Sequence, residues 1–541
     1  MRTRTASSLV ALVSAALTVT GVSQLPASGS SAGSPDRNGS APPAAAAHAS
    51  GDDPLGSALD DILDNPRLAH ASVSVIVRDA QTGQVLYHRD PDRRLNPASN
   101  AKLLTSSAAM GLLGAGSRFT TKVESNAAPR NGTLRGDLYL RGGGDPTLLQ
   151  ADYAGLAQQL RKDGVRQVLG DLVADDSYFD DDPLGNGWSW DDESYYYSAV
   201  TSGLTVAPNT DYDSGTVIVQ TSPGARVGDT VQLQLVPATN AVRVVNHTTT
   251  GAPGSSSSID VERAHGSNVV TVSGSMPQGG AMSQHWVTVP DPTTYAADVF
   301  RRALRHEGIR LEGHVTEGTT PAGADILAQH RSMTLSDLMV PFLKLSNNMH
   351  AEDLTKAMGV EVSGAGSWPA GTRAITDYLQ ADGVDTSGLR LRDGSGLSRL
   401  DLVSARNVTD TLIAAQDEPW FDTWYDALPI AGNPERFVGG TLRNRMQDTP
   451  AANNLHGKTG SLTSVSALSG YVTNADGRRL VFSMISNNYL GNDPKDLEDA
   501  VGVTLASWSE QDATVRGVDP KSLRPERHVP DGIECSWAKA C

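Results

Sequence analysis

Three short strings of residues carry groups that could do chemistry together: Ser99-Asn100-Ala101-Lys102, Ser346-Asn347-Asn348 and Lys458-Thr459-Gly460. They supply a hydroxyl nucleophile, an amine that can accept its proton, and a second set of hydroxyl, amide and ammonium groups. Because the strings are far apart in the chain, only a fold can bring them together. Combined, they predict acyl transfer through a covalent serine ester.

The first string pairs a nucleophile with a base. Ser99 and Lys102 are three residues apart, so on a helix their side chains share one face. A serine in the first helical turn lies where backbone N–H groups favour negative charge. Burial or a nearby cation such as Lys458 would favour the neutral amine of Lys102. An N-cap serine followed by a solvated lysine gives the same string, and Ser536-Trp537-Ala538-Lys539 also matches it, but no useful helix follows that second copy.

The second string follows a predicted helix, with another helix expected from about Ala351. In the loop between them, Ser346 could relay a proton and Asn348 could hold a substrate amide. A polar turn has the same composition, and Ser486-Asn487-Asn488 repeats the letters at the end of a later hairpin. Chain order and setting favour the copy at Ser346.

The third string opens a predicted strand. An edge strand beside a cleft can accept an extended peptide as an added strand, and Gly460 permits a close backbone approach. Lys458 and Thr459 could bind a terminal carboxylate. A basic strand start in solvent would look the same in isolation, but three strings in this order favour function.

Helices and hairpins surround these strings, and the pattern predicts an α+β domain with an antiparallel sheet covered by helices. We expect a helix from Leu55, a hairpin before Ser99 and an apolar helix after it. Further helices are expected from Thr334, and a hairpin turns at Asp476-Gly477 before a last helix. Between about Phe119 and Gln329 the chain reads as short strands with a single helix, residues 293–307. We therefore expect a catalytic domain split into residues 54–119 and 331–515, a mostly-β insertion of residues 120–330, and terminal segments 1–53 and 516–541.

The net charge, the first residues and the cysteines indicate the kind of partner and the cellular compartment. The formal charge of −17 over 541 residues argues against nucleic acid or anionic membrane as the main partner. Arg2 and Arg4 precede an apolar run and then a Ser-, Gly-, Pro- and Ala-rich stretch, which is typical of a secretory signal, with an uncleaved anchor as the alternative. Cleavage could follow Ala27 or Ala49. The only cysteines, Cys535 and Cys541, are predicted to form a disulfide in an exported protein.

The chain resembles the class C low-molecular-mass penicillin-binding proteins, the D-alanyl-D-alanine carboxypeptidase/endopeptidase family, over roughly Leu55 to Trp508. Besides the three strings, four segments look like signatures of that family: residues 140–146, 188–197, 393–399 and 457–463. The resemblance implies a penicillin-binding or serine β-lactamase-like domain with a large insertion between the first and second motifs. It implies an exported enzyme without cofactor or metal that acts on peptidoglycan stem peptides and is acylated by β-lactams.

The family likeness also implies roles for individual residues. Ser99 would be acylated with Lys102 as base, and Ser346 and Lys458 would relay a proton to the departing D-alanine. Asn348 would hold the substrate amide, and the N–H groups of Ser99 and Ser461 would form the oxyanion hole. The remaining substrate-binding positions implied along the strand are Lys458, Thr459, Gly460 and Thr463.

A side-chain pocket is implied by three further residues: Asp192, Tyr197 and Arg399. An acid and a base together suit the zwitterionic end of diaminopimelate, with Asp192 on its ammonium and Arg399 on its carboxylate. The alternative is that both are surface charges or pair with each other.

Other functions remain open at this stage. A serine β-lactamase would share the acylation step and add fast hydrolysis of the acyl-enzyme, and a non-catalytic penicillin or peptidoglycan sensor would use Ser99 only to trap its ligand. A zinc peptidase could catalyse the same net reaction, but the histidines show no His-Glu-x-x-His spacing, so no metal site is predicted. The sequence does not predict an oligomeric state.

Overall fold

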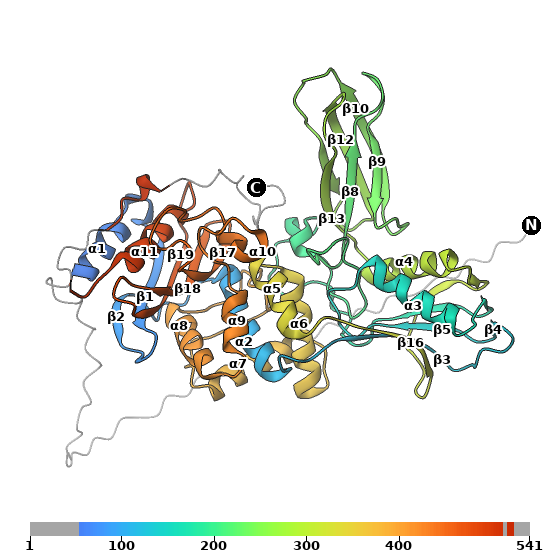
Figure 1. The fold of residues 1–541 in the computed structure, drawn as a ribbon, viewed down its shortest axis with the longest axis horizontal. Helices are drawn as coiled ribbons and strands as arrows, with labels where there is room; N and C mark the ends of the chain where they lie inside the picture. The colour runs from blue at the N-terminus through green and yellow to red at the C-terminus, as the bar shows by residue number, and fades with distance from the viewer. Residues whose placement is uncertain (1–53, 512–516, 524–541) are drawn as a thin grey trace, which may run out of the picture. The chain divides into compact units, whose positions relative to one another are not determined.

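The computed structural model describes residues 54–511 and 517–523 (Figure 1). The predicted signal segment 1–53 lies outside these residues, and so do Cys535 and Cys541, so the signal and the disulfide stay predictions. Within the described ranges, no helix combines the length and apolar character needed to cross a membrane.

A five-stranded sheet joins the start of the described chain to its end. All neighbouring strands are antiparallel, in the order β17-β18-β19-β1-β2, and β17 is a terminal strand. β1 pairs with β19 so that Ser72 lies opposite Asn487. The strands are β1 (Ser72–Asp79), β2 (Val85–Arg89), β17 (His456–Leu462), β18 (Val465–Thr473) and β19 (Arg479–Asn487).

Helices cover both faces of this sheet because its strands carry apolar side chains on both (Figure 1). Successive strand residues point to opposite faces, so Ala467 and Leu468 of β18 belong to two different apolar clusters. One cluster includes α1 (Pro54–Leu63) and α11 (Lys495–Ser507). The other includes α2 (Ala101–Leu112), α5 (Leu335–Lys344), α6 (Asn348–Ser363), α7 (Trp368–Ala381), α8 (Ala405–Ala414) and α9 (Phe421–Ala427). A short helix, α10 (Arg436–Gly439), precedes β17.

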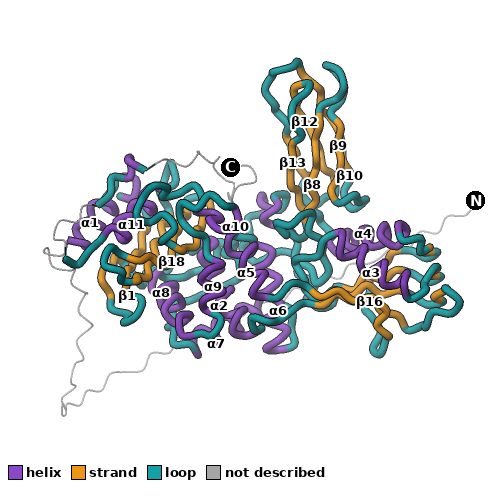
Figure 2. Tube along the Cα trace, viewed as in Figure 1, coloured by secondary structure: helices purple, strands orange, loops and turns teal. Residues whose placement is uncertain are grey.

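The residues from Thr120 to Arg331 form sheets of their own, and among the described residues none of their strands joins the five-stranded sheet (Figure 2). A second five-stranded sheet has the order β15-β7-β5-β3-β16, and three smaller sheets have the orders β14-β6-β4, β13-β8-β9 and β10-β12-β11. The strands are β3 (Thr120–Ser125), β4 (Thr133–Leu134), β5 (Leu138–Arg141), β6 (Gln167–Val168), β7 (Leu172–Asp175), β8 (Thr216–Ser222), β9 (Gln232–Val236), β10 (Arg243–Gly251), β11 (Asp260–Arg263), β12 (Val269–Pro277), β13 (Ser283–Thr288), β14 (Arg310–Leu311), β15 (Val315–Glu317) and β16 (Asp325–Arg331). The predicted α+β fold with a large mostly-β insertion is confirmed, while the exact domain boundaries stay a prediction.

The insertion holds two helices, so the expectation of a single one was wrong. α4 (Pro292–His306) matches the predicted helix, and α3 (Gln150–Lys162) was missed. Tyr153, Leu156 and Leu160 of α3 are buried in the apolar cluster of the insertion, together with residues of α4. The apolar spacing of α3 is helical, but glycines, a proline and short strands precede it and hide the periodicity.

Candidate active site

Ser99 and Lys102 meet at the start of α2. A short 3₁₀ turn, Ala98–Asn100, leads directly into the helix and places both side chains on one face. Lys102 Nζ lies 2.8 Å from Ser99 Oγ, 2.6 Å from Asn348 Oδ1 and 2.8 Å from the carbonyl oxygen of Ser395. Lys102 is fully buried. The nucleophile and its predicted base are therefore within reach for proton transfer.

The backbone before the nucleophile is held in an uncommon conformation. Ala98 has a φ of 45°, in the left-handed region that a residue with a side chain seldom adopts. A Cβ on Gly396 would lie 1.9 Å from the Ala98 carbonyl oxygen, and one on Gly460 would lie 3.1 Å from the Ser99 nitrogen. Both glycines thus allow their segments to press against the turn that carries Ser99. The close approach expected at Gly460 is made by the protein's own chain.

Ser346 and Lys458 form the second contact between strings. Lys458 Nζ donates to Ser346 Oγ and to the carbonyl oxygen of Thr459, at 2.8 Å in each case. Ser346 is buried and has a φ of 57°, at the turn between α5 and α6. The ammonium of the third string is therefore positioned to pass a proton through the hydroxyl of the second.

Asn348 is the first residue of α6, so the expected helix start near Ala351 was three residues too late. Asn347 caps the helix by accepting a hydrogen bond from the His350 N–H. The Asn348 amide accepts from Lys102 and donates from Nδ2 to the carbonyl oxygen of Tyr197 at 2.8 Å. A side-chain amide offers both acceptor lone pairs and N–H donors, which are the groups needed to bind a substrate amide.

A buried carboxylate behind the base escaped the sequence analysis. Glu352 lies one helical turn after Asn348 and accepts hydrogen bonds from the N–H groups of Gly394 and Ser395, at 3.0 Å each, and from Trp368 Nε1 at 2.7 Å. It thereby fixes the loop whose Ser395 carbonyl accepts from Lys102. Burial, with the charge of Asp393, raises the pKa of Glu352 to about 7.

Asp393 orders the same loop from its other end. Its carboxylate accepts from the N–H groups of Gly396 at 2.9 Å and Ser398 at 2.6 Å, and from Trp188 Nε1 at 2.8 Å. Two of the family-like segments, residues 188–197 and 393–399, therefore meet here. Sequence reasoning singled out both segments but used only Asp192, Tyr197 and Arg399 from them, because the role of a buried carboxylate depends on contacts far apart in the chain.

His350 remains uncharged beside the site. Burial lowers its pKa to about 3, and the charge of Lys102 acts in the same direction. Its Nε2 lies 2.9 Å from the carbonyl oxygen of Tyr212. The imidazole consequently adds no cation next to Lys102 at neutral pH.

The predicted side-chain pocket residues lie in two groups. Tyr197 is buried, and its hydroxyl donates to Asp192 Oδ1 at 3.0 Å. Arg399 is exposed and donates from Nη1 to the carbonyl oxygen of Thr463 at 2.9 Å. These contacts place each group in a defined position, and the pocket between them stays a prediction.

The strand residues of the site follow the predicted edge. Thr459 Oγ1 donates to Thr441 Oγ1 at 2.8 Å, and Ser461 lies opposite Ser466 in the β17–β18 ladder. Since Gly460 lies against the Ser99 nitrogen, its neighbour Ser461 is close to the nucleophile, as an oxyanion hole formed by both residues requires. In the part of the chain that the structure describes, no three His, Cys, Asp or Glu side chains gather as metal ligands would.

Known proteins match this chain over most of its length. A D-alanyl-D-alanine carboxypeptidase of Actinomadura sp. (strain R39) is 43% identical over 490 residues, which cover 89% of each chain. The crystal structure of penicillin binding protein 4 (dacB) from Haemophilus influenzae matches with a TM-score of 0.69 at 28% identity, covering 80% of this chain and 94% of that one. A second structure of that protein, complexed with a novel β-lactam, matches with a TM-score of 0.66 at 27% identity and covers 83% and 98%.

The resemblance inferred from the sequence strings is thus confirmed by both kinds of comparison. Residues 55–508, which hold all three strings and the whole of the insertion, match the D-Ala-D-Ala carboxypeptidase 3 (S13) family. The chain belongs to that family.

Proposed function

We propose that this protein is a serine D-Ala-D-Ala carboxypeptidase that hydrolyses D-Ala-D-X bonds of peptidoglycan stem peptides through an acyl-enzyme. The observation that carries the proposal is the buried contact of Lys102 Nζ with Ser99 Oγ at 2.8 Å, beside a second buried pair, Lys458 and Ser346. A hydroxyl, a base and a separate proton relay are the groups that serine acyl transfer needs.

Acylation begins when Lys102 removes the Ser99 proton and Oγ bonds to the carbonyl carbon of the penultimate D-alanine. The oxygen of the tetrahedral intermediate gains negative charge, which the N–H groups of Ser99 and Ser461 would stabilise. When the intermediate collapses, its C–N bond breaks. The departing D-alanine nitrogen takes a proton from the Ser346 hydroxyl, which Lys458 replenishes.

Deacylation repeats these steps with water in place of Ser99. Lys102 first passes the proton that it took from Ser99 back to Lys458, which restores its neutral amine. A water molecule then gives a proton to Lys102 and attacks the ester carbonyl, and as the C–O bond to Ser99 breaks, Lys102 returns that proton to Ser99 Oγ. The buried Lys102, fixed by Asn348 and the Ser395 carbonyl, serves as base in both halves. β-Lactams would acylate Ser99 by the same first half-reaction.

The direction of the bound peptide follows from the two ends of the site. Its terminal carboxylate would bind at Lys458 and Thr459, and its scissile carbonyl would lie between Ser99 and Ser461. The peptide then runs antiparallel to β17, with its amino-terminal part passing Leu462 and Thr463.

Three further parts of the proposal concern the stem peptide that is recognised, endopeptidase activity and export. Recognition of diaminopimelate by Asp192 and Arg399 is supported by the hydrogen bond from Tyr197 to Asp192 and by that from Arg399 to Thr463, because the Tyr197 carbonyl also contacts Asn348 and Thr463 directly follows β17. Endopeptidase activity on cross-linked stem peptides would use the same acyl-enzyme. Export is supported by the signal-like pattern of Arg2, Arg4 and the apolar run after them.

Mass spectrometry of the penicillin adduct tests the proposal directly. The label is expected on Ser99, Ser99→Ala is expected to abolish both labelling and D-alanine release, and the exposed Ser117→Ala serves as its matched control. A label on another residue would overturn the site. Rapid nitrocefin turnover would favour a β-lactamase, and stable labelling without release of D-alanine from a diaminopimelate peptide would favour a sensor.

A further inference from the structure

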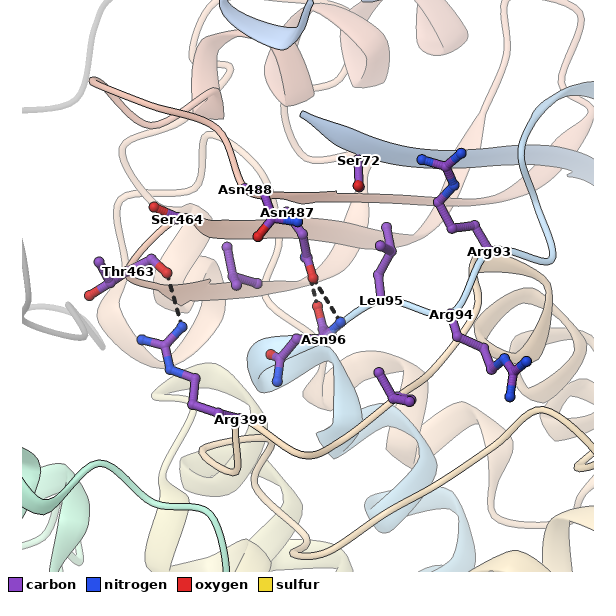
Figure 3. A pocket seen from close by; sticks show the side chains of 12 residues that line it. Ser72, Arg93, Arg94, Leu95, Asn96, Arg399, Thr463, Ser464, Asn487 and Asn488 are labelled. Atoms are coloured by element: carbon purple, nitrogen blue, oxygen red, sulfur yellow. Dashed lines mark hydrogen bonds between the residues drawn. The ribbon is translucent and has the colours of Figure 1, made fainter. Parts of the chain in front are cut away.

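The middle asparagines of the two Ser-Asn-Asn strings bind different parts of the protein. Asn487 accepts from the Asn96 N–H at 2.8 Å and donates to the Asn96 carbonyl oxygen at 3.0 Å, beside an open pocket (Figure 3). Asn347 directly follows the relay residue Ser346 and donates to a loop of the insertion. The insertion therefore reaches the second string of the active site.

The loop that Asn347 contacts consists of residues 209–214 and is called the clasp loop below. Asn347 Nδ2 lies 3.3 Å from the Asp211 carbonyl oxygen, 3.1 Å from the Tyr212 carbonyl oxygen and 3.3 Å from Asp213 Oδ1. Asn347 is buried, and its Oδ1 caps α6. The second string is thus fixed to the insertion as well as to its own helix.

The clasp loop holds its own shape. Asn209 accepts from the Tyr212 N–H at its carbonyl oxygen, at 3.0 Å, and from the Asp211 N–H at its Oδ1, at 3.1 Å. Thr216, the first residue of β8, donates from Oγ1 to the Asp213 carbonyl oxygen at 2.7 Å. Because the loop is ordered by its own hydrogen bonds, it presents its acceptors in fixed positions.

Arg436 binds the clasp loop from the other side. Its guanidinium donates to both carboxylate oxygens of Asp211, with 2.9 Å between Nη2 and Oδ2. Such a bidentate pair fixes direction as well as distance. The Asp211 side chain is 10% exposed and that of Arg436 is 39% exposed, so the arginine is the partner that can be replaced without opening the interior.

The segment that begins at Arg436 also reaches the third string. A Cβ on Gly440 would lie 2.4 Å from the Lys344 carbonyl oxygen, so the segment presses against the end of α5. Thr441 Oγ1 accepts from Thr459 Oγ1 at 2.8 Å. The segment therefore contacts the helix that leads into the second string and the strand that carries the third.

We propose that Asp211 and Arg436 are positioning residues for the proton relay. Their ion pair fixes the clasp loop on Asn347, and this holds Ser346 at the distance from Lys458 that the relay needs. The inference rests on the proposed function and adds a role for the insertion to it. The relay protonates the departing nitrogen, so a misplaced hydroxyl slows the leaving groups that need this proton. A thiolate leaves without one, because a thiol has an ordinary pKa of only about 8.5.

A matched pair of substrates tests the positioning role. Both carry the same acyl group and a terminal carboxylate, and they differ only in the leaving atom, the nitrogen of D-alanine or the sulfur of the corresponding thioester. The ratio of kcat/KM for amide over thioester is expected to fall by about 10-fold or more in Arg436→Gln and in Asp211→Asn. Because the two residues act as one unit, the double variant is expected to lose no more than the larger single loss.

Three further variants show through which group the pair acts. Arg301→Gln is the matched control, because Arg301 is 46% exposed and pairs with Asp298, 9% exposed, within the insertion; it is expected to keep the natural ratio. Arg436→Lys keeps the charge and loses the bidentate geometry, so an intermediate ratio is expected. In a Ser346→Ala background, Arg436→Gln is expected to leave the ratio unchanged, because the relay hydroxyl is already absent.

The outcomes separate this inference from the proposed function, because damage common to both substrates cancels in the ratio. Equal losses on amide and thioester, or single losses that multiply in the double variant, would refute the positioning role. A further fall of the ratio when Arg436→Gln is added to Ser346→Ala would also refute it. The proposed function fails separately, if penicillin does not label Ser99 in the natural protein.

Discussion

The chain contains the letters Ser-Asn-Asn twice, and the two copies do different work. In the copy at 346–348, Ser346 Oγ accepts from Lys458 and Asn348 Oδ1 accepts from Lys102. The copy at 486–488 ends β19, where Ser486 lies opposite Ser466 and Asn487 ties down Asn96. The first copy contacts the two catalytic lysines, and the second is bonded to backbone groups of Asn96.

The difference shows that the Ser-Asn-Asn string determines the local turn, while tertiary contacts determine what the turn does. Both copies include a left-handed residue, Ser346 with a φ of 57° and Asn488 with a φ of 62°, so both form tight turns. The neighbours of each turn then decide its function: a lysine on each side of the first copy, and the strand segment before Ser99 beside the second. Short polar strings predict a turn, and only tertiary contacts make one a proton relay.

Replacing each of the two serines by alanine gives the largest expected difference in activity. Ser346→Ala removes the hydroxyl that Lys458 contacts, so kcat/KM for D-alanine release is expected to fall by about 10²- to 10⁴-fold. Ser486→Ala is expected to change it less than about threefold, because Ser486 lies within a strand. Steady-state release assays check both variants, and equal losses in the two would erase the distinction.

The support behind the first copy gives the next largest effect. Glu352→Gln retains the shape of the side chain but offers fewer lone pairs to three donors, so penicillin acylation is expected to slow by about 10- to 100-fold. Burial raises the pKa of Glu352 to about 7, so the side chain becomes protonated as pH falls through 7. The rate of penicillin acylation of the natural protein is therefore expected to decline there.

The pH profile distinguishes this positioning role from simple loss of stability. Glu352→Gln is expected to lose the step near pH 7 in the acylation rate. Glu498 is also buried, with a pKa raised to about 7 by burial, but it contacts Arg445 and Ser466. Glu498→Gln is therefore expected to lower stability and retain the step, and an unchanged profile in Glu352→Gln would contradict the assignment.

The second copy is expected to matter chiefly for stability. Asn487→Ala removes two hydrogen bonds and leaves the buried N–H and C=O of Asn96 without these partners. The free energy of unfolding is expected to fall by about 1 to 3 kcal/mol, with a smaller loss of activity than in Ser346→Ala. Urea denaturation measures the first quantity, and a variant as stable as the natural protein would show that the tie is dispensable.

A site away from both copies gives the smallest effect and a baseline for acid sensitivity. Burial alone would raise the pKa of Asp79, but hydrogen bonds from Thr82 and Arg478 outweigh it and lower the pKa to about 2. Since the folded pKa is lower than the unfolded one, Asp79 stabilises the fold above pH 4 and this contribution is lost as pH falls towards 2. Arg478→Gln is expected to reduce this contribution to the free energy of unfolding by about 1 kcal/mol, measured by urea denaturation at pH 6 and pH 3. An equal loss of stability at the two pH values would contradict the linkage.

The sequence predicted the convergence of Ser99, Lys102 and Lys458 because each string combines reactive groups with a turn or strand signal. It predicted the terminal hairpin for the same local reasons. Glu352 could not be recognised, because a carboxylate within a helix shows its function only when the loop at Gly394 and Ser395 packs onto it. The part of Tyr197 that holds Asn348 is a backbone oxygen, which no residue pattern specifies.

The terminal position of β17 has a consequence beyond catalysis. The outer edge of a sheet that can take up an extended peptide is also a template for a strand of another molecule, and thus an aggregation hazard. Here the bridge between Ile430 and His456 and the bond from Gly457 N–H to Pro429 cover the beginning of that edge. Among the described residues, the stretch from Lys458 to Leu462 pairs with no further strand on that side, so the edge next to Ser99 is left to an extended peptide.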